Sequence, residues 1–239
     1  LDQTLAWIAE NKMYAILDFH SIGYPPAEDF ESAYDGIYLT STEEWKQFWR
    51  DVARHYRDNK TVVFYELFNE PVFPGYSFDI HSVYCNQSDW LGWRDSVEDV
   101  VGIIQHIDRQ KIILVGGLSW AYDISYALTA PIRADNIVYS THPYPNSNWH
   151  TTWQNAFGKV KDKYPVMETE FGFDLNGDKA ESKYKGGHRY RNDIMLFLDE
   201  KRISWVAWCF SNKWMPTLLA DKNGNPNEAG HFFRDKLRR

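Results

Sequence analysis

The chain has no long apolar run, no excess of basic charge and only two cysteines among its 239 residues. Because a membrane-spanning helix needs about 20 consecutive apolar residues, the sequence predicts no transmembrane segment and no membrane partner. The formal net charge is -7, whereas nucleic-acid binding needs a basic face, so no nucleic-acid partner is expected. The start, Leu1-Asp2-Gln3, shows no basic-then-apolar leader, so no signal peptide is visible.

The two cysteines, Cys85 and Cys209, are too few for a disulfide framework. We expect two buried free thiols, and a single bridge is the alternative because both residues can lie at the same end of the fold. The patterns His-x-His and His-Glu-x-x-His are also absent, so we expect no metal and no cofactor.

Aromatic residues, in contrast, are abundant: 11 Trp, 15 Tyr and 14 Phe make up 17% of the chain. Most are expected to fill a large core, as Trp45 and Trp49 do if they lie four residues apart on a helix. The Trp count still exceeds ordinary usage. Because flat aromatic faces pack against the apolar C–H faces of sugar rings, this excess favours a glycan-binding site.

Apolar runs alternate with helical patterns along the whole chain. Ser41 and Glu44 form a capping-box pattern at the start of one helix. Apolar strands separated by helices are typical of a parallel sheet covered on both faces, so we predict an α/β fold of about six βα units in one domain, residues 1–239. The predicted strands are 13–20, 61–69, 111–115, 136–142, 165–170 and 203–209, and the predicted helices are 1–12, 41–57, 89–107, 121–127, 149–163, 179–201 and 227–237.

Polar side chains gather at the C-terminal ends of these strands. In a parallel barrel such ends meet on one face, which carries the active site. Their repetition on successive strands favours one functional site over many separate structural roles. The residues are Asp18, His20, Asn69, Glu70, Thr141, His142, Tyr144, Glu168, Glu170, Trp208, Ser211 and Asn212.

Glu70 and Glu170 lie at opposed strand ends, which suits glycoside hydrolysis. Two carboxylates about 5–5.5 Å apart give a retaining mechanism, with one as nucleophile and the other as acid and then base. A partly buried, carboxylate-rich pocket raises the pKa of the acid and keeps it protonated. Asn69 is placed to bind a sugar hydroxyl, Tyr144 to donate a hydrogen bond to the nucleophile, and Trp208 to form the floor under the reacting sugar.

Four motifs occur in a fixed order: Asn69-Glu70-Pro71, His142-Pro143-Tyr144, Glu170-Phe171-Gly172 and Trp205-x-x-Trp208. From about residue 13 to the C-terminus this set resembles glycoside hydrolase family 5, the cellulase family. The resemblance implies a TIM (β/α)8-type barrel and a retaining β-glycanase, with an internally cut β-1,4-glucan as the favoured substrate. Mannan, mixed-linkage glucan and β-1,3-glucan stay open. The family also implies secretion.

The resemblance assigns Glu70 as acid/base at the end of the fourth barrel strand and Glu170 as nucleophile at the end of the seventh. It implies that the substrate-binding residues are His20, Asn69, His142, Tyr144 and Trp208. Further Trp residues are candidate sugar subsites, with core packing as an equal alternative: Trp120, Trp149, Trp153 and Trp214. Glu168 is expected to be a lower-layer barrel residue in an ion pair.

One departure from the family concerns the start of the barrel. If residues 13–20 form the third strand, the first two strands are absent from this chain, together with the arginine that orients the nucleophile in the family. Neither Arg54 nor Arg109 sits at a strand end. The open strand edges and interior predict pairing with a second copy, most simply as a two-fold dimer. The alternative is a fragment of a longer chain.

Two other classes of function follow from this departure. A catalytically impaired glycan-binding protein would bind cello-oligosaccharides without releasing product from an aryl β-cellobioside. A metal-dependent barrel hydrolase would lose activity in the presence of chelators.

Overall fold

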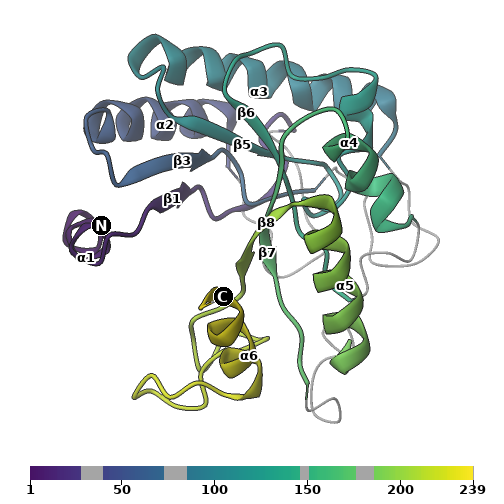
Figure 1. The fold of residues 1–239 in the computed structure, drawn as a ribbon. Helices are drawn as coiled ribbons and strands as arrows, with labels where there is room; N and C mark the ends of the chain where they lie inside the picture. Colours follow the sequence, from purple (N-terminus) through teal and green to yellow (C-terminus); the bar gives the residue numbers. More distant parts are fainter. Residues whose placement is uncertain (28–39, 73–84, 146–150, 176–185, 239) are drawn as a thin grey trace.

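The computed structural model describes residues 1–27, 40–72, 85–145, 151–175 and 186–238. Within these ranges six parallel strands form one curled sheet in the order β1-β3-β5-β6-β7-β8. The curl is visible in Figure 1, where β7 and β8 run at a steep angle to β3 and β5. The predicted α/β fold, an incomplete (β/α)8-type barrel of six βα units, is confirmed. The strands are β1 (Ala15–Asp18), β3 (Val62–Glu66), β5 (Ile112–Gly116), β6 (Ile137–Thr141), β7 (Val166–Phe171) and β8 (Ser204–Ala207).

Helices α2 (Thr42–Tyr56) and α3 (Gln87–Ile107) lie side by side over one face of the sheet (Figure 1). The predicted capping box of Ser41 and Glu44 opens α2. Trp45 and Trp49 on α2 are fully buried, as predicted. Their indole N–H groups donate to the carbonyl of Leu67 at 2.7 and 2.9 Å, so α2 anchors the backbone just before Asn69 and Glu70.

The remaining helical elements depart from the prediction in two places. The short helix expected at 121–127 is a 3-10 turn, η1 (Ser125–Leu128), because Trp120 and Ala121 have left-handed φ angles of 56° and 54° that no α-helix accommodates. The helix expected at 149–163 is, in its described part, a π-helical turn, η3 (Gln154–Gly158), followed by α4 (Lys159–Lys161). The described helices at the two ends and before β8 are α1 (Asp2–Glu10), α5 (Gly187–Lys201) and α6 (Glu228–Leu237).

The predicted strand 61–69 was wrong in its extent, and the difference concerns the site directly. β3 ends at Glu66, and a separate strand, β4 (Glu70–Pro71), pairs in parallel with β2 (Ile22–Gly23). The Glu70 N–H donates to the Ser21 carbonyl at 3.1 Å. Glu70 is therefore held by the segment that follows β1 rather than by the main sheet.

Strands β1 and β8 are the two edges of the described sheet. This agrees with the expectation that residues 13–20 form the third strand of the barrel. Tyr14, just before β1, is 75% exposed, and Val206 on β8 is 37% exposed. Cys85 and Cys209 are free thiols, although each is half-buried rather than fully buried. Among the described helices, none combines the length and the apolar character needed to cross a membrane.

Candidate active site

Glu70 on β4 and Glu170 on β7 meet at the C-terminal face of the sheet, together with His142 after β6. One carboxylate oxygen of each glutamate and one ring nitrogen of His142 lie within 4.8 Å of one another. The side chain of Glu70 is 13% exposed and that of His142 only 1% exposed. The structure thus brings together two carboxylates that are 100 positions apart in the sequence.

Tyr144 binds the second of these carboxylates. Its hydroxyl donates to Oε1 of Glu170 at 2.7 Å, the contact named by the sequence prediction. Burial raises the pKa of Glu170 to about 7; the nearby Glu70 also raises it, whereas His142, Tyr144 and His20 lower it. Within the described ranges no Arg or Lys forms an ion pair with Glu170, and the groups there that lower its pKa are His142, Tyr144 and His20.

His142 sits at the centre of a group of carboxylates. Its Nδ1 lies 3.2 Å from Oε1 of Glu70, and its Nε2 lies 3.0 Å from the hydroxyl oxygen of Thr169. Burial favours the neutral imidazole, but the carboxylates of Glu170, Glu66 and Glu70 outweigh it and raise the pKa of His142 well above its ordinary value.

His20 and Trp208 meet where the two edge strands end. The His20 ring stacks on the Trp208 indole with centroids 5.4 Å apart and planes 9° from parallel. Nδ1 of His20 is hydrogen-bonded to Oδ2 of Asp18 at 2.6 Å, and the Trp208 indole N–H donates to the Met215 carbonyl at 3.1 Å. Burial raises the pKa of Asp18 to about 6, although its bond to His20 opposes this.

The other predicted substrate-binding residues differ in placement. Asn69 is buried directly before Glu70, and its backbone N–H donates to the Phe19 carbonyl at 3.1 Å. Trp214 is 71% exposed on the segment after β8, and none of the described contacts ties it to the two glutamates. Trp149 lies outside the described residues.

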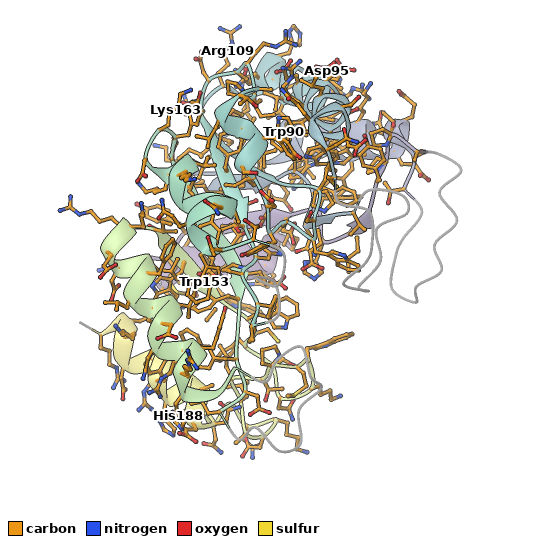
Figure 2. The ribbon with its side chains drawn as sticks, turned by 90° about the vertical axis from the view of Figure 1, so that its right-hand side faces the viewer. Trp90, Asp95, Arg109, Trp153, Lys163 and His188 are labelled. Atoms are coloured by element: carbon orange, nitrogen blue, oxygen red, sulfur yellow. The ribbon has the colours of Figure 1, made fainter. Side chains whose placement is uncertain are left out.

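Of the further candidate subsites, Trp153 is a packing residue. Its ring contacts Tyr190 and Phe197 on α5 at centroid distances of 5.8 and 5.7 Å, and Figure 2 shows it beside that helix. Figure 2 also places Arg109 at the edge of the molecule, before β5 begins, which agrees with its exclusion as a site arginine.

The predicted ion pair of Glu168 was wrong. Glu168 is fully buried, and neither of its carboxylate oxygens has a hydrogen-bond partner in the described part of the chain. Burial, reinforced by the nearby Glu170, raises the pKa of Glu168 well above its ordinary value even though His142 lowers it. The physical reason for the difference is that none of the described Arg and Lys side chains forms an ion pair with Glu168, and His142, which lowers its pKa, makes no hydrogen bond to it.

Sequence reasoning missed Glu66 and Thr169, which are buried at 4% and 8% exposure. The Thr169 hydroxyl donates to Oε1 of Glu66 at 2.5 Å. A signal for Glu66 was available, because a carboxylate inside the apolar run Phe64-Tyr65-Glu66-Leu67-Phe68 is costly to bury unless it is hydrogen-bonded. Nothing in the sequence identified its partner.

The atoms of Glu70, His142 and Glu170 are close enough to approach one metal ion. Each residue, however, already has a hydrogen-bond partner: Glu70 and His142 bind each other, and Tyr144 binds Glu170. We therefore interpret the three as acid–base groups and assign no metal to them.

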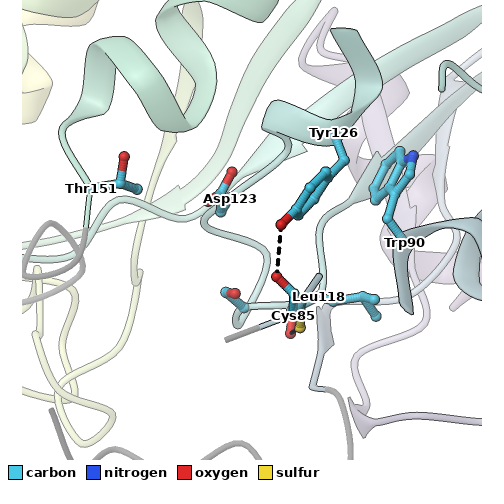
Figure 3. Close-up of a pocket in the computed structure, with 7 residues that line it drawn as sticks. Cys85, Trp90, Leu118, Asp123, Tyr126 and Thr151 are labelled. Carbon is cyan, nitrogen blue, oxygen red and sulfur yellow. Dashed lines mark hydrogen bonds between the residues drawn. The ribbon is translucent and has the colours of Figure 1, made fainter. Parts of the chain in front are cut away.

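A hollow of about 230 Å³, shown in Figure 3, is lined by residues other than the two glutamates. It is lined in part by Cys85, Trp90, Leu118 and Tyr126, and the Tyr126 hydroxyl donates to the Cys85 carbonyl at 3.0 Å. It contains none of the predicted site residues, and we assign it no ligand.

Comparison with known families supports the resemblance found in the sequence. Residues 1–214 match the family model described as Cellulase (glycosyl hydrolase family 5). The chain therefore belongs to glycosyl hydrolase family 5.

Two curated relatives are endoglucanase A of Butyrivibrio fibrisolvens, 28% identical over 215 residues, and cellulase CelDZ1 of a Thermoanaerobacterium species, 28% identical over 233 residues. Each match covers 89% of this chain but only 43% and 53% of the respective relative, so the chain spans about half their length.

Among solved structures, the β-glucanase SdGluc5_26A of Saccharophagus degradans superposes with a TM-score of 0.85 at 33% identity, covering 99% of this chain and 70% of that one. The coverage agrees with a barrel of which this chain provides six strands. The endoglucanase Cel5A of Thermobifida fusca, at 22% identity and a TM-score of 0.74, supports the fold alone.

Proposed function

We propose that this chain is the catalytic part of a retaining β-1,4-glucanase in which Glu170 is the nucleophile and Glu70 the acid/base. The observation that carries the proposal is the separation of their carboxylates. The nearest oxygens lie within 4.8 Å, which fits the retaining spacing of about 5–5.5 Å and leaves no room for the water of an inverting pair at about 6.5–9.5 Å.

The reaction proceeds in two steps at these two residues. In the first, Glu170 attacks the anomeric carbon while Glu70 gives its proton to the departing glycosidic oxygen, which forms a glycosyl–Glu170 ester. In the second, Glu70 takes a proton from water, and the resulting nucleophile attacks the same carbon and releases Glu170. The configuration at the anomeric carbon is retained because it is inverted twice.

The surrounding side chains support this division of roles. Tyr144 donates to the nucleophile, His142 contacts the acid/base, and Asn69 lies beside Glu70. Trp208 forms a half-buried aromatic platform at the site, which suits the apolar face of a sugar ring.

The relatives support a β-glucan substrate. Endoglucanases and a cellulase are among them, and the Saccharophagus β-glucanase has been solved in complex with cellotetraose. We propose an internally cut β-1,4-glucan on this basis, with mannan and other β-glucans as the alternatives within the same family. Secretion, and a single catalytic domain over residues 1–239, belong to the same proposal.

Hydrolysis of an aryl β-cellobioside tests the proposal. The wild-type chain is expected to release the phenol, and Glu170→Gln is expected to lower turnover by several orders of magnitude. Glu200→Gln, an exposed glutamate on α5, is the matched control and should behave like the wild type. Unchanged turnover in Glu170→Gln would end the assignment of the nucleophile.

One observation favours a second candidate, an impaired glycan-binding protein. Burial raises the pKa of Glu170 to about 7, and among the described residues neither Arg nor Lys pairs with it. A wild-type chain that binds cello-oligosaccharides in calorimetry but releases no phenol at any pH between about 5 and 9 would support this reading over hydrolysis.

We also propose that a second copy covers the open edges, most simply as a two-fold dimer. The exposed strand edges of β1 and β8 and the exposed Tyr14 and Val206 support this. Light scattering at micromolar concentration is expected to give twice the mass of one chain, and a clean monomer would contradict it.

A further inference from the structure

A continuous hydrogen-bonded chain runs from Glu66, the last residue of β3, to the acid/base Glu70. Glu66 accepts from the Thr169 hydroxyl at 2.5 Å, the hydroxyl oxygen lies 3.0 Å from Nε2 of His142, and Nδ1 of His142 lies 3.2 Å from Oε1 of Glu70. Glu66, Thr169 and His142 are all buried. The chain therefore links a carboxylate that substrate cannot reach to one that the proposed reaction uses.

The chemistry of Thr169 sets the direction of these bonds. A hydroxyl has one hydrogen to donate, and its short bond to the Glu66 carboxylate uses it. Toward His142 the hydroxyl can then only accept, so Nε2 must carry a hydrogen. The tautomer of a histidine is fixed in this way by the partner of its other nitrogen.

With a hydrogen fixed on Nε2, the other ring nitrogen of His142, Nδ1, is either unprotonated or protonated. Unprotonated, it accepts a hydrogen bond from the carboxylic acid form of Glu70; protonated, it donates to the Glu70 carboxylate. Either state keeps one proton between Nδ1 and Glu70, and moving that proton from one atom to the other requires no other reactant. This is the proton that the first step of the proposed reaction delivers to the leaving group.

We propose that Thr169 and Glu66 are positioning residues for the acid/base: they hold His142 with its hydrogen on Nε2, so that Nδ1 faces Glu70 and shares the acid proton with it. This inference rests on the proposed role of Glu70. It assigns no contact with substrate to Thr169 or Glu66.

The titratable groups around His142 come from four strands: Asp18 at the end of β1, Glu66 on β3, Glu70 on β4, and Glu168 and Glu170 on β7. The carboxylates of Glu170, Glu66 and Glu70 favour a proton on His142. Because this field surrounds His142 regardless of Thr169, losing the hydroxyl removes the orientation of the ring and leaves the charge around it in place.

Leaving-group dependence distinguishes positioning of the acid from a general structural role. Phenyl β-cellobioside needs a proton on its leaving oxygen, whereas 2,4-dinitrophenyl β-cellobioside departs as the anion. Thr169→Val is expected to lower kcat/KM for the phenyl substrate by about 100-fold and for the dinitrophenyl substrate by less than about threefold. Thr169→Ser, which restores the hydroxyl, is expected to recover most of the loss.

Thr129→Val is the control for the substitution itself. Thr129 is exposed, and its hydroxyl donates to the Tyr126 carbonyl at 3.2 Å, outside the chain that ends at Glu70. Its loss should leave the ratio of the two kcat/KM values unchanged. Equal losses on both substrates in Thr169→Val, or no loss, would overturn the proposal.

The tautomer itself provides a measurement that needs no turnover. In protein labelled with ¹⁵N-histidine, the signals of His142 are assigned by their absence in His142→Gln. The proposal predicts a hydrogen on Nε2 that exchanges slowly in the wild type and loses its protection in Thr169→Val. A wild type that hydrolyses neither substrate would refute the proposed function only, whereas an unprotonated Nε2 would refute the positioning role even in an active enzyme.

Discussion

Glu168 provides the most quantitative prediction about this protein. Its side chain is fully buried on β7, and neither carboxylate oxygen has a partner among the described residues. Burial without a hydrogen-bond donor favours the protonated acid and outweighs the opposing effect of His142, which is why the pKa of Glu168 lies well above its ordinary value. In the unfolded chain the same group ionises near its ordinary value of about 4.3.

This difference makes the stability of the fold depend on pH. The folded state binds the proton more tightly than the unfolded chain, so its contribution to stability is fully present below the unfolded pKa and is lost as the pH rises toward the folded pKa. Each pH unit in that window costs about 1.4 kcal/mol. Glu168 therefore makes the fold less stable at about pH 7.5 than at about pH 5, with a slope that does not exceed this value per pH unit.

Glu168→Gln removes the titrating group with little change in volume. Its amide adds a buried donor that lacks a partner, at a cost of about 1–3 kcal/mol at every pH. The stability of the variant relative to the wild type is therefore expected to rise between about pH 5 and about pH 7.5, because only the wild type loses the contribution of the Glu168 proton.

Urea denaturation followed by tryptophan fluorescence at the two pH values measures this difference. Glu10→Gln, at an exposed position at the end of α1, is the control and should follow the pH dependence of the wild type. If Glu168→Gln shows the same pH dependence as the wild type, Glu168 is ionised in the folded protein and the reasoning from its burial is refuted.

Two further predictions concern activity. Because the pKa of Glu170 is raised to about 7 and the nucleophile must be ionised, kcat/KM is expected to fall as the pH drops below about 7. Tyr144→Phe removes a hydrogen bond that lowers this pKa, so the decline of kcat/KM should move to higher pH in the variant. A flat profile down to about pH 5 would contradict both expectations. Trp208→Ala removes the ring stacked on His20 and should weaken cellotetraose binding about tenfold in calorimetry, whereas unchanged affinity would exclude a sugar platform there.

The sheet could be predicted from the sequence because its signals are local. Each of the six main strands is a short apolar run between helical patterns, and the Ser41–Glu44 capping box marks the start of α2 without reference to the rest of the fold. The break after Glu66 could not be predicted in the same way. It depends on the pairing of Glu70–Pro71 with Ile22–Gly23, which lie almost fifty residues away.

Backbone geometry set by tertiary contacts explains the errors in the helices. Residues 121–127 have a helical composition, but Trp120 and Ala121 adopt left-handed φ angles. At Gly117 a Cβ atom would lie 1.9 Å from the Asp123 carbonyl oxygen, so the chain folds tightly back on itself at this point. Such close approach is visible only once the loop after β5 is folded.

The candidate site likewise contains residues whose placement could be predicted from the sequence and residues whose placement could not. Glu70, Glu170 and Tyr144 could be expected near one another because parallel strands deliver their C-terminal ends to one face. The chain through Glu66 and Thr169 depends on which side of β3 and β7 each residue faces, and on the register between strands that are not neighbours in the sheet. The expected ion pair of Glu168 failed for a related reason, since a partner across the barrel cannot be read from its own strand.

The central claim, that Glu170 forms a covalent bond to the sugar, can be tested in one measurement. The protein is incubated with 2,4-dinitrophenyl 2-deoxy-2-fluoro-β-cellobioside, which slows the second step, and the labelled peptide is identified by mass spectrometry. A retaining mechanism with this nucleophile predicts one fluorocellobiosyl group on the peptide that contains Glu170, attached to that residue. A label on another residue, or hydrolysis of the unfluorinated substrate without any label, would contradict the account.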